Sequence, residues 1–228
     1  APFRTLTRAV RELRGGAGDQ LLATSGEQGL VFYEEVSITP DRSGTIGRPT
    51  VISAWPGQPH PILDGALPER PDQPGLTTGI HVGASFVRVI GFTVRHFVEN
   101  GISLNGSTGN VIEDCKVESC DRHGIFAYYS PRSTIVRPEV RNCQHQGISI
   151  RSSPHTAVID GLSEANGFDG LPCFSPDGKS LAWTSNRGTA KQSQIRLARW
   201  NHEMALRLLA EAGNVPVTEE TQGALQPS

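Results

Sequence analysis

Two sets of residues suited to acid–base or electrostatic chemistry flank a series of regularly spaced glycines. The set before the glycines is Glu99, Asp121, Arg122, His123 and His145, and the set after them is His81, Asn105, Tyr128, Tyr129 and Arg151. Histidine and tyrosine can accept or donate a proton, arginine can neutralise a carboxylate, and carboxylates can hold a cation such as calcium. Because Glu99, Arg122 and His145 are 23 residues apart, a fold with that period would place them in one line.

The glycines define the period. Gly79, Gly101, Gly124 and Gly147 are separated by 22, 23 and 23 residues, and Gly170 extends the series by another 23. Each of the first four precedes an Ile, after which polar or aromatic residues alternate with apolar ones. A repeat of this length predicts an all-β solenoid, in which each coil buries its core against its neighbours.

Laying the chain in register by 23 residues gives columns of consistent chemistry. Three columns are predicted to face the core: Val89, Ile112, Ile135 and Val158; Val94, Val117, Val140 and Ser163; and Phe97, Cys120, Cys143 and Asn166. Three outward columns alternate in sign: Arg95, Glu118, Arg141 and Glu164; Asp114, Arg137 and Asp160; and Lys116 and Glu139. Because like charges facing each other destabilise a sheet, these columns predict surface ion pairs.

The four cysteines, Cys115, Cys120, Cys143 and Cys173, have no metal-site or disulfide-framework spacing. Cys120 and Cys143 are 23 residues apart and would stack on adjacent coils about 4.8 Å apart, within reach of a disulfide. Alternatively, they are small residues that fill the internal stack.

Composition excludes some classes of protein. Of 228 residues, 36% are hydrophobic, which suffices for a core, and the formal charge of -2 predicts no nucleic-acid partner. No apolar stretch approaches the roughly 20 residues of a membrane-spanning helix. The chain begins Ala1-Pro2 rather than with Met, so we expect that a signal peptide has been removed or that an upstream piece is missing.

The first element predicted along the chain is a helix. Leu6, Ala9, Val10 and Leu13 have helical spacing, which predicts an amphipathic helix over residues 5–13 that caps the open end of the solenoid. Short β-like runs separated by turn residues follow over residues 20–54 and predict the first coils.

The ordered combination of residues 2–6, 47–57, 61–65 and the Gly-Ile repeats resembles secreted right-handed parallel β-helix proteins of the pectate-lyase-like superfamily, over residues 1–166. The resemblance implies that fold for this segment. It implies no single activity, because the fold hosts lyases, hydrolases, epimerases and non-catalytic adhesins.

A second resemblance begins near Gly167. Residues 167–200, with the turn Ser175-Pro176-Asp177-Gly178, resemble one blade of a TolB-like β-propeller, and a helix is predicted over 202–212. The predicted organisation is a β-helix over 1–166, a blade-like segment with a C-terminal helix over 167–213, and a flexible tail over 214–228. The segment after 166 is a natural cap, a fragment of a second domain, or the second part of a chimera.

The first resemblance implies a secreted or periplasmic protein that binds an acidic polysaccharide and acts on it as a lyase, epimerase or hydrolase. In such lyases and epimerases, a base removes the proton beside a uronate carboxylate while a cation neutralises that carboxylate. On this hypothesis Arg122, His145 and Tyr128 are catalytic. The substrate-binding residues are His81, Asn105, Tyr129 and Arg151, and the calcium ligands are Glu99 and Asp121.

Two alternatives stay open. Glu99, Arg122 and His145 also fit another ladder of alternating charge, and the sequence contains no full calcium-ligand cluster of the kind polysaccharide lyases use. These features favour a non-catalytic surface or adhesion solenoid. The third hypothesis is a fragment of, or a chimera with, a TolB-like envelope propeller protein. Calcium is the only cofactor that the sequence suggests, and the oligomeric state is not indicated.

Overall fold

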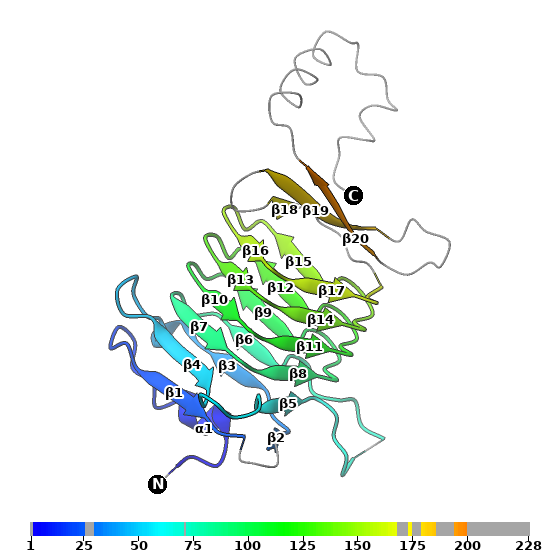
Figure 1. Ribbon diagram of the computed structural model, residues 1–228. Helices are drawn as coiled ribbons and strands as arrows, with labels where there is room; N and C mark the ends of the chain where they lie inside the picture. Colours follow the sequence, from blue (N-terminus) through cyan, green and yellow to red (C-terminus); the bar gives the residue numbers. More distant parts are fainter. Residues whose placement is uncertain are drawn as a thin grey trace.

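The computed structural model describes residues 2–25, 30–70, 72–167, 173–174, 179–185 and 194–199. Three parallel sheets run along a stack of coils, and consecutive strands of one coil belong to different sheets (Figure 1). Each coil is therefore one turn of a parallel β-helix, as predicted.

We call the sheets A, B and C. Sheet A contains β1 (Gln20–Ala23), β4 (Thr50–Ala54), β7 (Val87–Ile90), β10 (Val111–Glu113), β13 (Thr134–Val136) and β16 (Ala157–Ile159). Sheet B contains β2 (Val31–Phe32), β5 (Ile62–Asp64), β8 (Thr93–Arg95), β11 (Lys116–Glu118), β14 (Glu139–Arg141) and β17 (Leu162–Glu164). Sheet C contains β3 (Val36–Ile38), β6 (Ile80–Val82), β9 (Ile102–Asn105), β12 (Ile125–Tyr128) and β15 (Ile148–Arg151). One 3-10 turn (Pro40–Arg42) lies between β3 and β4.

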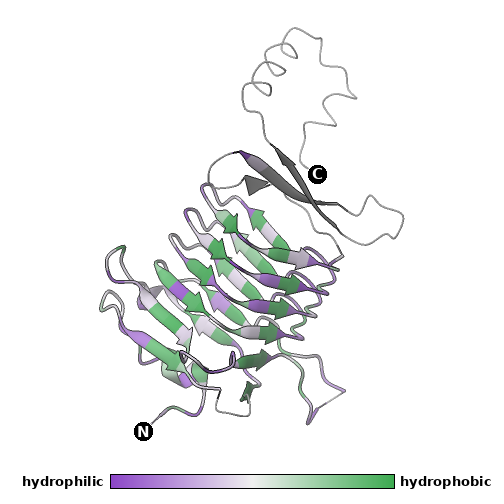
Figure 2. Ribbon diagram, viewed as in Figure 1, coloured by the Kyte–Doolittle hydropathy of each residue, from purple (hydrophilic) through white to green (hydrophobic). Residues whose placement is uncertain are grey.

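The predicted register of 23 residues is confirmed in all three sheets. Ile112 pairs with Val89 and Ile135 in sheet A, and the side chains of all three are fully buried. Successive side chains of a strand point to opposite faces, so apolar and polar residues alternate along most strands (Figure 2). The core is thus a set of columns that run along the stack.

The outward charges form the predicted pairs. Glu118 pairs in register with Arg95 and Arg141. The ion pairs that follow are Arg141–Glu164 at 2.7 Å, Arg137–Asp114 at 2.7 Å, Lys116–Glu139 at 3.2 Å and Arg95–Glu118 at 4.0 Å. Because these side chains are largely exposed, each pair fixes register more than it adds stability.

Crowding between neighbouring coils explains why glycine recurs with this period. A Cβ added at Gly124 would overlap the Val140 side chain and lie 2.6 Å from the carbonyl oxygen of Gly147, and Gly101 is crowded in the same way by Val117. Neither glycine has a positive φ, so its conformational freedom is not the reason. The coil spacing leaves no room for a side chain at these positions.

Helix α1 (Leu6–Val10) covers the first coil and is shorter than the predicted helix over 5–13. The Thr5 side chain accepts a hydrogen bond from the Arg8 amide, and the Glu34 carboxylate accepts hydrogen bonds from the Leu6 and Thr7 amides at 2.7 and 2.9 Å. After Val10 the backbone amides of Glu12 and Leu13 donate to carbonyl groups three residues earlier instead of four, so the α-helix ends there. The predicted apolar face is buried against the core, so the capping role is confirmed.

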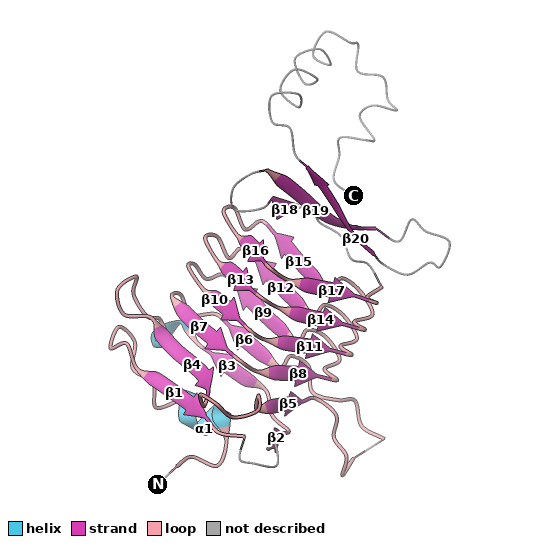
Figure 3. Ribbon diagram, viewed as in Figure 1, coloured by secondary structure: helices cyan, strands magenta, loops and turns pink. Residues whose placement is uncertain are grey.

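Beyond the coils, β18 (Cys173–Phe174), β19 (Ser180–Ser185) and β20 (Gln194–Arg199) form an antiparallel sheet. Strands β19 and β20 pair antiparallel, from Ser180 with Arg199 to Ser185 with Gln194 (Figure 3). The predicted helix over 202–212, the tail over 214–228, Gly170 and the turn over 175–178 lie outside the described residues.

We predict that Gly124→Ala lowers the free energy of unfolding by about 2 kcal/mol, because the new methyl group cannot fit without moving the neighbouring coil. Urea unfolding followed by circular dichroism measures this change. Gly47→Ala is the matched control, since no atom lies within 4 Å of the Cβ position there. Equal stability of the two variants would contradict the crowding explanation.

Candidate functional site

An aromatic row lies on the outer face of sheet C, along strand β12 and the residues beside it. The His123 ring stacks on Phe126 with centroids 5.1 Å apart, and Phe126 stacks on Tyr128 at 5.8 Å. Tyr129 continues the row, with its ring centroid 4.3 Å from that of Tyr128. Phe126 and Tyr128 face outward because Ile125 and Ala127, which alternate with them, fill the core.

Strand pairing brings three of the predicted site residues side by side. Tyr128 pairs in register with Asn105 on β9 and with Arg151 on β15. The Arg151 guanidinium carbon lies 5.9 Å from the centre of the Phe126 ring, within the range of a cation–π interaction. The sequence period thus placed Asn105, Tyr128 and Arg151 correctly, and Tyr129 follows directly.

His81 lies in a different column from these residues. It pairs with Ser37 and Ser103, and Ser103 pairs in turn with Phe126. Its strand is therefore two coils from β12, about 10 Å at the usual strand spacing. The half-buried His81 imidazole has a pKa below its ordinary value because burial disfavours its charged form. His81 belongs to the same face of sheet C but not to the column of Asn105.

The residues before the glycines form the predicted line. The Arg122 amide donates to the Glu99 carbonyl at 3.0 Å, and the His145 amide donates to the Arg122 carbonyl at 2.9 Å. The Arg122 guanidinium is 3.9 Å from the Glu99 carboxylate, a long ion pair between half-exposed groups. The His145 ring meets the edge of His123 with centroids 5.8 Å apart. Arg122 and His145 therefore border the aromatic row.

The proposed calcium ligands fit a metal site poorly. Glu99 is paired with Arg122, and the Asp121 carboxylate accepts a hydrogen bond of 2.7 Å from the side-chain amide of Gln144. Across the described parts of the chain, no group of three or more His, Cys, Asp or Glu side chains is placed to hold a metal ion. Calcium binding by Glu99 and Asp121 stays a prediction that this arrangement does not favour.

Buried polar atoms lie beside the aromatic row, and no individual role was predicted for their residues. Asn100 Oδ1, His123 Nδ1 and Ser149 Oγ are buried without a hydrogen-bond partner, and they are three of the five such atoms in the described residues. Their residues lie on three successive coils and are 6%, 4% and 1% exposed. An unsatisfied buried polar atom is costly, so this cluster suggests groups meant for a partner.

Two rings of the row have shifted pKa values. Burial lowers the pKa of His123 to about 4, with a further contribution from the positive charges of Arg122 and Arg151, so the imidazole is neutral at neutral pH. The pKa of Tyr128 is raised, chiefly by its hydrogen bond with Tyr129. Tyr128 is thus a proton donor at neutral pH, which favours a binding role over the predicted role as a base.

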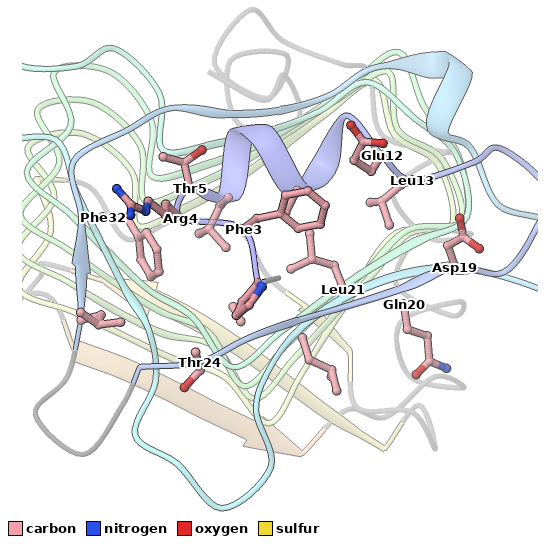
Figure 4. A pocket seen from close by; sticks show the side chains of 16 residues that line it. Phe3, Arg4, Thr5, Glu12, Leu13, Asp19, Gln20, Leu21, Thr24 and Phe32 are labelled. Atoms are coloured by element: carbon pink, nitrogen blue, oxygen red, sulfur yellow. The ribbon is translucent and has the colours of Figure 1, made fainter.

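A separate cavity of about 620 Å³ lies at the N-terminal end, between α1 and the first coil (Figure 4). Phe3, Leu21 and Phe32 give it an apolar lining. Its Asp19 carboxylate accepts hydrogen bonds from the Arg14 side chain at 2.9 and 3.0 Å, so this charge is already neutralised. None of the candidate site residues predicted from the sequence lines this cavity.

A profile of the right-handed β-helix region matches residues 78–198, more than half of the chain. The chain belongs to this right-handed β-helix family. A search of curated proteins gave no match.

The fold is shared with one solved structure. The crystal structure of pectate lyase Pel9A is 13% identical and superposes with a TM-score of 0.54, covering 68% of this chain and 41% of that one. A structure titled rhamnogalacturonan lyase is 14% identical, with a TM-score of 0.40 and coverage of 73% and 53%. The chain spans about half the length of these structures. The predicted pectate-lyase-like β-helix is confirmed as a fold.

The β-helix profile also covers part of the segment after residue 166. The β-helix profile runs to residue 198 and so extends over β18, β19 and most of β20. The resemblance to a TolB-like propeller blade, and the domain boundary at 166, stay predictions.

We predict that His123→Gln removes part of the acid sensitivity of the fold. The folded state favours neutral His123, so its contribution to stability is present above the unfolded pKa of about 6.5 and is lost as the pH falls toward 4. The loss is on the order of 1 kcal/mol after discounting for solvent screening. Urea unfolding at about pH 7 and about pH 4.5 measures it, with the exposed His155→Gln as control. An unchanged pH dependence in His123→Gln would contradict the assignment.

Proposed function

We propose that the outer face of sheet C, from β9 to β15, binds an acidic polysaccharide. The observation that carries this proposal is the aromatic row of His123, Phe126, Tyr128 and Tyr129, with Arg151 packed over the Phe126 ring. Aromatic faces offer apolar contact to sugar rings while a tyrosine hydroxyl remains available for hydrogen bonds.

Hydroxyl groups of a sugar match the unsatisfied atoms beside the row. Asn100 Oδ1 is an acceptor, and neutral His123 can accept or donate a hydrogen bond at Nδ1. A ligand hydroxyl that reached these atoms would remove the cost of leaving them unsatisfied.

The charges around the row favour an acidic ligand. Arg151 is exposed and makes one long hydrogen bond of 3.4 Å to Gln146, and Arg122 is only loosely paired with Glu99. Both guanidinium groups therefore remain available to a sugar carboxylate, which arginine binds with charge-assisted hydrogen bonds. The likeness in fold to a pectate lyase supports the same substrate class.

A secreted or periplasmic location is part of this proposal, because such polymers lie outside the cytoplasm. In the described part of the chain, no helix has the length and apolar character needed to cross a membrane.

We predict that Tyr128→Ala and Arg151→Ala each weaken binding of polygalacturonate or alginate by about tenfold. Affinity electrophoresis and calorimetry measure the change. Arg141→Ala, an exposed arginine on sheet B of the same coil as Arg151, is the matched control and keeps wild-type affinity. Loss of affinity in all three variants alike would indicate non-specific charge attraction and would contradict a site on sheet C.

A lyase or epimerase activity at the same face is the second candidate. Arg122 and His145 lie on adjacent coils beside the aromatic row, so one could neutralise a uronate carboxylate while the other removes the neighbouring proton. Tyr128 completes the set as a proton donor.

If the face is catalytic, Arg122→Ala and His145→Ala lower turnover at least a hundredfold, because each removes a group that acts in the transition state. Release of unsaturated sugars from alginate, pectate and glycosaminoglycans is followed by ultraviolet absorbance, with added calcium and with a chelator. Unchanged turnover in both variants would exclude these roles. A wild-type protein that binds the polymer without any turnover would instead favour the non-catalytic surface or adhesion solenoid.

A further inference from the structure

Cys120 and Cys143 lie on neighbouring coils where the chain leaves sheet B for sheet C. Each follows its sheet B strand by two residues, and those strands pair Glu118 with Arg141. The Gln144 amide donates to the Cys120 carbonyl at 2.9 Å, which continues the register through the turn. Adjacent parallel strands are about 4.8 Å apart, within the Cα separations that disulfides span.

The two thiols occupy equivalent positions on the neighbouring coils. Cys120 Sγ lies 3.7 Å from the Glu118 carbonyl and Cys143 Sγ lies 3.6 Å from the Arg141 carbonyl, so the side chains have the same orientation. The Cys143 thiol is the chief cause of the raised pKa of Cys120, so the two sulfurs lie close enough to interact. Both side chains are buried, at 0% and 1% exposure, so neighbouring atoms hold them in line.

The recurring glycines create the space in which this pair sits. A Cβ at Gly101 would lie 3.3 Å from Cys120 Sγ, and one at Gly124 would lie 3.2 Å from Cys143 Sγ. The same column holds Phe97 and Asn166 on the flanking coils, so Cys120 and Cys143 are each other's cysteine neighbours in it.

We propose that Cys120 and Cys143 are a dithiol that oxidising surroundings close into a disulfide between neighbouring coils. One thiolate attacks a sulfur of a small disulfide such as oxidised glutathione and releases one glutathione thiolate. The second cysteine, after losing its proton, attacks the resulting mixed disulfide at the protein sulfur and releases the second glutathione. Two electrons pass to the oxidant and two protons to solvent.

The folded protein slows this reaction but does not prevent it. The neighbouring Cys143 thiol, together with burial, raises the pKa of Cys120, so the reactive thiolate is scarce. Oxidation therefore requires a local opening of the coils, or occurs during folding. Once formed, the bond closes a loop of about 23 residues and constrains the unfolded chain. This inference does not depend on the proposed polysaccharide function.

Cys115 provides an internal comparison. It is fully buried, and burial raises its pKa to about 11. The residues one period before and after it are Phe92 and Pro138, so no second cysteine is stacked on it. Its sulfur contacts the carbonyl groups of Val89 and Glu113 rather than another thiol. A buried cysteine without a stacked partner should stay reduced under the same conditions.

The test uses the full chain carrying Cys173→Ser, treated with either dithiothreitol or oxidised glutathione. We expect the oxidised sample to lose the mass of two hydrogens and, after trypsin digestion, to give residues 117–122 linked to residues 142–151. Its melting temperature should be higher by about 5 °C or more. Adding Cys115→Ser leaves both results unchanged, and adding Cys120→Ala or Cys143→Ala abolishes both.

The comparison of oxidised and reduced protein needs no further substitution, so it remains decisive if the alanine variants do not fold. Recovery of both cysteines as alkylatable thiols after oxidation and denaturation would overturn the proposal. A linkage that involves residues 96–116, the peptide of Cys115, would also overturn it.

Discussion

The fixed spacing between coils is the constraint on which the rest of this structure depends. Backbone hydrogen bonds hold neighbouring strands at one distance, so everything between two coils must fit that gap. At Gly101 and Gly124 the valines and carbonyl groups of the next coil leave no room for a Cβ. A side chain there would push two coils apart and weaken the ladders of all three sheets. The glycine repeat is thus a requirement of packing.

The same spacing turns each residue type into a column with its own physical role. Apolar columns fill the interior, and charge columns alternate in sign because like charges at this separation would repel. Arg137 illustrates the second case, since it bonds to both Asp114 and Glu113 and its pKa is raised by these carboxylates. Most charged residues of sheet B are accounted for in this way, which leaves few for function.

The outer face of sheet C departs from this pattern, and that departure marks it as the functional candidate. Aromatic rings replace charge pairs along β12, arginine packs on an aromatic face, and buried polar atoms lack partners. The buried polar atoms without partners cost stability, which the paired groups elsewhere in the stack do not. Natural proteins commonly accept such local costs where a ligand is bound.

The sequence alone determined the period, the inward columns, the charge pairs and the capping helix, because each depends on residues related by a fixed spacing. It also placed Asn105, Tyr128 and Arg151 in one line. His81 lies outside this line, because it follows Gly79 by two residues whereas Asn105 follows Gly101 by four, and it therefore pairs with Ser103. The sequence placed His123 among the residues suited to acid–base chemistry, but it did not show that His123 is buried and stacks on Phe126. It singled out neither Phe126 nor Asn100. Those properties arise from side chains of different columns meeting across the turn, and only the tertiary structure decides them.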